Sequence, residues 1–277
     1  MRDELPQQAA TSRFVATRPR LRHLEWTVVS EFSAPHISMI IAVFTLAGMV
    51  KGMTGMGLPT VAMGVLGALM PPATAASLVI IPSFVTNVWQ LLTGPNVVAL
   101  FSRLWLMMLG IVIGTLVGSR LLTSDNTQWA TIGLGTALLA YTLFCLLAPP
   151  LSISAPLQRW LSPIAGLTTG FVTGGTGVFV IPAVPYLQAL DLNKDDLVQA
   201  LGLSFTVSTV ALAVGLERGG AFELRNALAS LFAVFPSLLG MGFGQLIRRR
   251  IKAATFRLWF LICLAFLGLD LAVRPFL

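Results

Sequence analysis

The stretch KGMTGMGLP, residues 51–59, places a lysine, three glycines and a proline inside otherwise apolar sequence. Residues 36–70 around it carry no charge except Lys51, and one helix of that length would measure roughly 50 Å. The hydrocarbon core of a bilayer is only about 30 Å thick, so a single straight crossing does not fit. We therefore expect two half-length helices that meet inside the membrane at the glycines, where protein or a water-filled cavity satisfies the freed backbone groups.

A second glycine-rich stretch, TGGTGV at residues 173–178, is also followed by a proline, Pro182. Aligning Gly55 with Gly175 and Gly57 with Gly177 relates the two stretches by an offset of 120 positions, which pairs Lys51 with Phe171. Two such breaks in one apolar chain predict the two halves of a single site.

Composition indicates an integral membrane protein. The 277 residues are 56% hydrophobic and 10% charged, against about 25% charged residues in soluble domains. The mean hydropathy is +0.84. Several apolar stretches reach the roughly 18 residues of a membrane-spanning helix, whereas barrel strands would be short and alternating. We expect an all-α, multi-pass protein of the cell (inner) membrane, with the lipid bilayer as its surroundings.

Charge and reactive residues exclude several function classes. The net charge of +7 would suggest nucleic acid for a soluble protein, but the arginines gather in the N-terminal tail and in loops, the usual topology signal of membrane proteins. We therefore expect no nucleic-acid partner. Cys145 and Cys263 stand in apolar segments without metal-ligand spacing, which predicts neither a metal site nor another cofactor. His23 and His36 lie at or before the first segment, so an enzyme would lack the usual general base inside the membrane.

About eight hydrophobic segments are expected, in two homologous repeats of four elements each. Small residues support the match, because Gly110, Gly114 and Gly118 have the spacing of close helix contacts. Pro236, Gly240 and Gly244 repeat this spacing at an offset of 126. The expected segments are residues 36–70, 73–93, 104–122, 129–147, 160–190, 197–216, 226–247 and 256–273. The predicted organisation is a polar Arg-rich tail (1–35), a first repeat (36–148), a linker (149–159) and a second repeat (160–277).

The relation between the repeats depends on the glycine-broken elements. If each one crosses the membrane the repeats are parallel, and if each is a re-entrant hairpin they are inverted. The excess length of both elements favours inverted repeats with hairpins. Orientation stays open, because an Arg-rich tail inside the cell puts the basic loop at residues 248–252 outside, against the positive-inside rule. For the tail we expect a mobile cytoplasmic segment, with an interfacial helix as the alternative.

These features resemble the sulfite exporter TauE/SafE family, also grouped as 4-toluene sulfonate uptake permeases. The resemblance rests on the two breaks, GMTGMGLP and TGGTGVFVIP, and on the following helices, which open with ATAAS at residue 73 and ALGLS at residue 200. It extends over about residues 36–273, although Met56 and Leu58 stand where the family usually has more glycine. The resemblance implies transport of small sulfur-containing or organic anions.

The glycine breaks also suit an anion on physical grounds. A half-helix that begins at mid-membrane presents unpaired N–H groups and the positive end of its dipole. Lys51 is a cation at membrane depth, where no acidic residue lies nearby in the apolar sequence to pair with it. The alternatives are that the glycines only pack helices and that Lys51 reaches lipid headgroups. The predicted substrate-binding residues are Lys51, Gly52, Thr54, Gly55, Gly57, Asn87, Gln90, Thr173, Gly174, Gly175, Thr176, Gly177 and Ser204.

The sequence therefore predicts a secondary transporter, most simply an exporter, that moves sulfite or organosulfonates by alternating access around a midplane site. A permease for another small anion such as a carboxylate is one alternative. A membrane scaffold that transports nothing is another. Neither the coupling ion nor the oligomeric state follows from the sequence.

Overall fold

The computed structural model describes residues 34–124, 127–147, 152–222, 224–248 and 253–276, and every regular element within them is helical. The all-α fold class is thus confirmed. The chain divides into two compact units, residues 1–40 and 41–277, and the second contains nearly all of the described helical residues. The predicted tail and its alternative, an interfacial helix using Phe14, Leu21, Leu24 and Trp26, lie outside the described residues.

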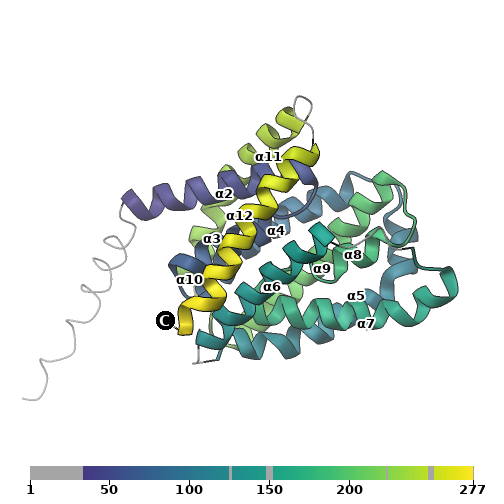
Figure 1. Ribbon diagram of the computed structural model, residues 1–277, viewed down its shortest axis with the longest axis horizontal. Coiled ribbons are helices and arrows are strands. Elements are labelled where there is room, and N and C mark those ends of the chain that lie inside the picture. The colour runs from purple at the N-terminus through teal and green to yellow at the C-terminus, as the bar shows by residue number, and fades with distance from the viewer. Residues whose placement is uncertain (1–33, 125–126, 148–151, 223, 249–252, 277) are drawn as a thin grey trace, which may run out of the picture. The chain divides into compact units, whose positions relative to one another are not determined.

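Helices of different lengths follow one another with short connections (Figure 1). They are α2 (Ala34–Thr54), α3 (Leu58–Leu69), α4 (Pro72–Leu92), α5 (Val97–Leu122), α6 (Thr127–Leu147), α7 (Ala155–Thr176), α8 (Ala183–Gln188), α9 (Lys194–Arg218), α10 (Leu224–Phe232), α11 (Val234–Arg248), α12 (Ala253–Val273) and a 3-10 turn, η1 (Arg274–Phe276).

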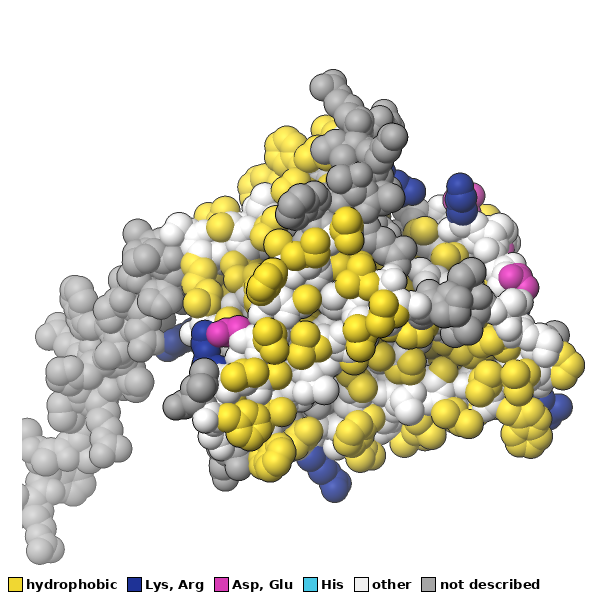
Figure 2. Space-filling view, viewed as in Figure 1, with side chains coloured by type: hydrophobic (Ala, Val, Ile, Leu, Met, Phe, Trp, Pro, Cys, Tyr) yellow, Lys and Arg dark blue, Asp and Glu magenta, His cyan; other side chains and the backbone are white. Residues whose placement is uncertain are grey.

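Six helical stretches in the described part of the chain are long and apolar enough to cross a membrane. Hydrophobic side chains cover much of the face seen in Figure 2, where the few basic and acidic side chains lie mostly near the margins. A surface of this kind is stable against lipid and not against water. The six stretches are Ile37–Thr54, Pro72–Leu92, Val97–Leu122, Thr127–Leu147, Lys194–Arg218 and Arg225–Arg248.

Several helix boundaries differ from those predicted. The helix before the first glycine break, α2, has 21 residues and is not half-length. Helix α7 begins at Ala155, inside the predicted linker. The predicted segment 226–247 is divided at Ala233 into α10 and α11, because Pro236 has no N–H to bond the carbonyl four residues earlier. Helix α9 begins early, since the Asn193 side chain accepts a hydrogen bond from the Asp196 amide at 2.8 Å and caps it.

Helices α4 and α9 pack against each other in opposite directions. Asn87 of α4 contacts Thr209 of α9, and four residues further along α4 the Leu91 carbonyl accepts a hydrogen bond from Gln199 Nε2 at 2.8 Å. Residue numbers therefore increase along α4 in the direction in which they decrease along α9. The two helices are antiparallel, so each one begins at the end where the other finishes.

Helices α5 and α7 run parallel and in close contact, and they lie side by side in Figure 1. A Cβ at Gly110 would lie 2.7 Å from the Pro163 carbonyl oxygen, and one at Gly174 would lie 2.6 Å from the Ser119 amide nitrogen. Both contacts are with backbone, so the helix axes are held at a separation that only glycine permits. The predicted role of Gly110, Gly114 and Gly118 in helix packing agrees with these contacts.

The same kind of contact joins α2 to α11. A Cβ at Gly48 or Gly52 would meet the backbone of Ser237 or Met241, and a Cβ at Gly240 or Gly244 would meet the backbone of α2. Higher residue numbers on one helix again match higher numbers on the other, so α2 and α11 are parallel.

After each glycine break the chain turns back along the helix it has left. Beyond α7, Tyr186 of α8 hydrogen bonds to Ser162, and the Ala189 carbonyl accepts from the Ile153 amide at 2.8 Å. The chain has thus returned to the start of α7. Beyond α2, the α3 residues Val61 and Val65 line one cavity together with Val50 and Leu46 of α2, so α3 lies beside the helix that precedes it.

Candidate functional site

The end of α2 is fixed by a threonine and two glycines. Thr54 Oγ1 donates to the Val50 carbonyl at 2.9 Å and accepts from the Met56 amide at 3.3 Å. Gly55 and Gly57 have φ angles of 79° and 101°, a region that a side chain disfavours, and Gly57 then caps the start of α3. The sequence TGMG therefore ends one helix and starts another within three residues.

The end of α7 has the same construction. Thr176 Oγ1 donates to the Val172 carbonyl at 2.7 Å and accepts from the Val178 amide at 3.2 Å, and Gly177 has a φ of 70°. Thr54 and Gly55 thus correspond to Thr176 and Gly177, an offset of 122 positions. The alignment made from the sequence, at an offset of 120, pairs Gly55 with Gly175 instead, so the two helix ends match in geometry at a spacing two residues longer. At the longer spacing Thr173 is matched with Lys51, whereas the alignment made from the sequence pairs Lys51 with Phe171.

Lys51 lies in the protein interior with 3% of its surface exposed. Its ammonium donates a hydrogen bond to Asn87 Oδ1, and Asn87 Nδ2 lies 3.4 Å from Thr209 Oγ1. Thr209 in turn donates to the Phe205 carbonyl at 2.6 Å. We call Lys51, Asn87 and Thr209 the central polar cluster, since α2, α4 and α9 each contribute one member. Within the described residues, no carboxylate pairs with Lys51.

Gln90 connects the first glycine break to α9. Its amide nitrogen donates to the carbonyls of Gly55 and Val198, each at 2.9 Å, while its Oε1 is buried without a hydrogen-bond partner. Three residues separate Gln90 from Asn87, so both side chains lie on one face of α4, as predicted. An unpaired amide oxygen in the interior is costly, which makes Gln90 a candidate to reorganise around a ligand.

The other predicted site residues lie in different surroundings. Gly52 and Gly174 face the backbones of α11 and α5, so close helix packing accounts for both. Gly175 borders Leu121, whose Cδ2 would lie 3.3 Å from an added Cβ. Thr173 Oγ1 donates to the Val178 carbonyl at 3.2 Å, across the second break. Ser204 is fully buried, and its hydroxyl has no hydrogen-bond partner.

Thr209 is the member of the central polar cluster that sequence reasoning missed. A threonine in an apolar helix usually bonds its own helix carbonyl, and Thr209 does so with Phe205. Thr209 stands 122 positions after Asn87, the same spacing that separates Thr54 from Thr176.

The sequence model of the family described as Sulfite exporter TauE/SafE matches residues 40–271. The match includes both glycine breaks and every member of the central polar cluster. The chain belongs to the sulfite exporter TauE/SafE family. None of the curated proteins and none of the solved structures gave a significant match to this chain.

The TauE/SafE family is a family of membrane transporters and not of enzymes, which confirms the predictions of family and of a non-enzymatic protein. Membership also agrees with a multi-pass chain in a lipid bilayer and with a small anion as partner. For a TauE/SafE protein, a buried lysine without a carboxylate is a suitable group to hold such an anion.

Proposed function

We propose that this protein is a secondary transporter that exports small sulfur-containing oxyanions, such as sulfite or an organosulfonate, across the inner membrane. The substrate binds at Lys51, with Asn87 and Gln90 as amide partners and the two glycine breaks beside it. The observation that carries the proposal is the burial of Lys51, whose ammonium has an amide oxygen as its only hydrogen-bond partner in the described part of the chain.

The chemistry of the central polar cluster favours an anion. An ammonium group has three donors, and Asn87 accepts from one of them. Two donors remain for a ligand that presents several oxygens in a small volume, as a sulfonate or sulfite does. A buried cation is stable when it is paired, and an oxyanion supplies both the charge and the acceptors.

We further propose that the chain is built from inverted repeats, α2–α6 and α7–η1, each starting with a re-entrant hairpin. The offset of 122 supports this, since it relates Thr54 to Thr176 and Asn87 to Thr209. The antiparallel pairing of the corresponding helices α4 and α9 supports inversion over a parallel arrangement. Inverted repeats with discontinuous helices are a common transporter plan, with the site between the halves.

Alternating access then consists of one repeat rocking against the other around Lys51. With a negative cytoplasm, export of one net negative charge gains about 2.3 kcal/mol per 100 mV, so export needs no coupled proton. Buried carboxylates of the kind that relay protons are absent from the described residues near Lys51, which agrees with uncoupled export.

The test is flux in proteoliposomes loaded with labelled sulfite, an organosulfonate or a carboxylate. We expect sulfonate-dependent flux for the native protein and its loss in Lys51→Ala, while Lys194→Ala, at the exposed start of α9, retains it. If Lys51→Ala transports the anion as fast as Lys194→Ala and the native protein, Lys51 is not part of the site. Selective carboxylate flux would favour the permease alternative, and no flux of any anion would favour a scaffold.

A further inference from the structure

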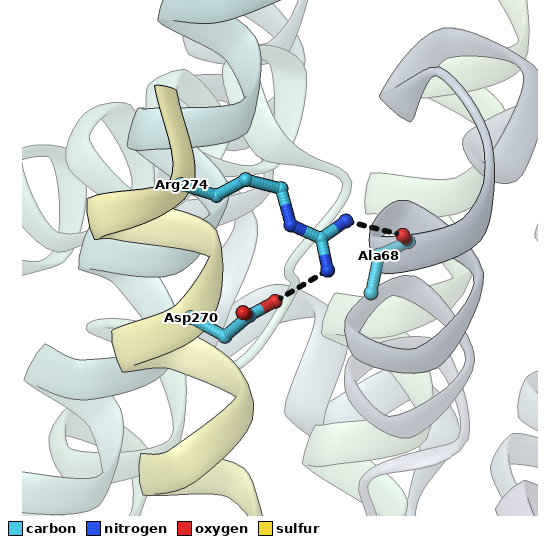
Figure 3. A network of polar contacts seen from close by, with 3 residues as sticks. All are labelled: Ala68, Asp270 and Arg274. Carbon is cyan, nitrogen blue, oxygen red and sulfur yellow. Dashed lines mark hydrogen bonds and ion pairs between the residues drawn. The ribbon is translucent and has the colours of Figure 1, made fainter. Parts of the chain in front are cut away.

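An exposed arginine in η1, directly after α12, holds the last turn of α3. Arg274 donates from one guanidinium nitrogen to the Ala68 carbonyl at 2.8 Å and pairs through the other with Asp270 at 2.9 Å, as Figure 3 shows. The bond joins the first half of the chain to the second. It is the kind of contact that a basic side chain makes with the negative end of a helix dipole.

The sequence explains why this carbonyl needs a partner from outside. A helix carbonyl normally accepts from the amide three or four residues later, but those positions after Ala68 are Pro71 and Pro72. Proline has no N–H. The Ala68 oxygen therefore cannot be satisfied by continuing the helix, and Arg274 supplies the missing donor.

A second arginine makes the corresponding bond at the other hairpin. Arg103 of α5 donates to the Leu190 carbonyl at 3.2 Å, just beyond α8, and to Gln158 Oε1 at 2.9 Å. Here a first-half residue holds the second-half hairpin. Leu190 stands 122 positions after Ala68, so the two bound carbonyls are at corresponding positions although the arginines are not.

The two contacts lie at opposite ends of the central helices. The Ala68 carbonyl precedes the start of α4, and the Leu190 carbonyl precedes the start of α9. Because α4 and α9 are antiparallel, these two starts are at opposite ends of the pair. If the protein carries anions as proposed, one arginine contact stands on each side of the substrate.

We propose that Arg274 and Arg103 are positioning residues for transport, each closing the pathway on its own face by tying the end of one hairpin to the opposite half. Release of the Arg274 contact opens the pathway at the α3 end, and release of the Arg103 contact opens it at the α8 end. The inference rests on the proposed transport function, but it concerns conformation and can be tested without a substrate.

The experiment measures from which face the centre is reached. Thr209→Cys is made in a chain with Cys145 and Cys263 replaced by alanine, and an impermeant thiol reagent is applied to either side of oriented vesicles. We expect Arg274→Gln to increase the labelling rate about fivefold from the α3 face and to lower it from the other. A fivefold change in labelling rate corresponds to the loss of one exposed charged hydrogen bond. Arg103→Gln should give the reverse pattern.

Controls separate this role from a general loss of packing. Arg120→Gln and Arg159→Gln remove exposed arginines outside the two contacts and should leave both labelling rates unchanged. Arg274→Lys, which keeps a positively charged donor for Ala68, should restore most of the native pattern. Opposite shifts for Arg274→Gln and Arg103→Gln support the proposal, while equal shifts at both faces, or none, overturn it. If labelling shifts as expected but no anion is transported, the proposed function fails and the conformational role stands.

Discussion

The side chains of Asn87 on α4 and Thr209 on α9 meet in the protein interior, with Nδ2 and Oγ1 3.4 Å apart. The two residues are 122 positions apart, the same offset that relates Thr54 to Thr176 at the ends of α2 and α7. If the chain is built from two inverted repeats, as proposed, corresponding residues that touch each other lie near the axis relating the halves. Lys51 donates to Asn87, so under that proposal it stands next to the axis on one side only, with Thr173 at the matching position on the other.

Asn87 should control both stability and anion binding. Asn87→Leu leaves the buried ammonium of Lys51 without its acceptor, and we expect the free energy of unfolding to fall by about 3 kcal/mol. Asn87→Asp places a carboxylate beside Lys51. This preserves the fold, but the carboxylate pairs with the ammonium that would otherwise bind an anion. Thermal melting with and without sulfonate checks both: the Asp variant should melt near the native temperature and lose the sulfonate-induced shift. A preserved shift in that variant would contradict an anion site at Lys51.

The contact between α5 and α7 should depend on glycine. Gly110→Ala places a Cβ 2.7 Å from the Pro163 carbonyl oxygen, so the helices must separate, at a cost of about 2 kcal/mol. Gly242→Ala in α11 is the matched control, because nothing lies within 4 Å of its added Cβ. There alanine should stabilise by about 0.5–1 kcal/mol through helix propensity. Melting temperatures of the two variants should therefore move in opposite directions.

The two helix breaks should respond differently to alanine. Gly55→Ala costs about 1 kcal/mol from its positive φ alone, since the nearest atom to the added Cβ is 4.0 Å away. Gly177→Ala adds a contact of 2.8 Å with the Met63 side chain and should cost about 2 kcal/mol. Met63→Ala removes the contacting side chain. In that background Gly177→Ala should therefore cost no more than Gly55→Ala does in the native protein. Equal costs at Gly55 and Gly177 would show that Met63 moves aside freely.

The hydrogen bonds of Gln90 should stabilise the first glycine break. Gln90→Leu removes the donors to the Gly55 and Val198 carbonyls and should destabilise by about 2 kcal/mol. Hydrogen exchange of the residues around Gly55 should accelerate, whereas exchange around Gly177 should not. Gln90→Glu retains a side chain of the same length but loses the donors, so it should behave like Gln90→Leu. If hydrogen exchange around Gly55 in both variants is as slow as in the native protein, the Gln90 hydrogen bonds do not stabilise the break.

Local pattern was sufficient for much of the candidate site. The lysine at membrane depth, the glycines that end two over-long segments, and Asn87 and Gln90 on one helix face all follow from residue type and spacing. Local pattern was insufficient for residues whose role depends on contact with a neighbouring helix. Gly52 and Gly55 look alike in sequence, yet one packs against the backbone of α11 and the other has a positive φ at the break.

The sequence by itself determined that the chain is an all-helical membrane protein with two glycine breaks, because burial in lipid requires long apolar helices and glycine ends them. It also determined the family. Only the tertiary structure showed that the φ angles and threonine bonds at the two helix ends match at a spacing of 122 residues. Tertiary structure alone joined Lys51 to Asn87 and Asn87 to Thr209, and Arg274 to Ala68. Those contacts depend on which helices pack together and in which direction, and no local pattern encodes that choice.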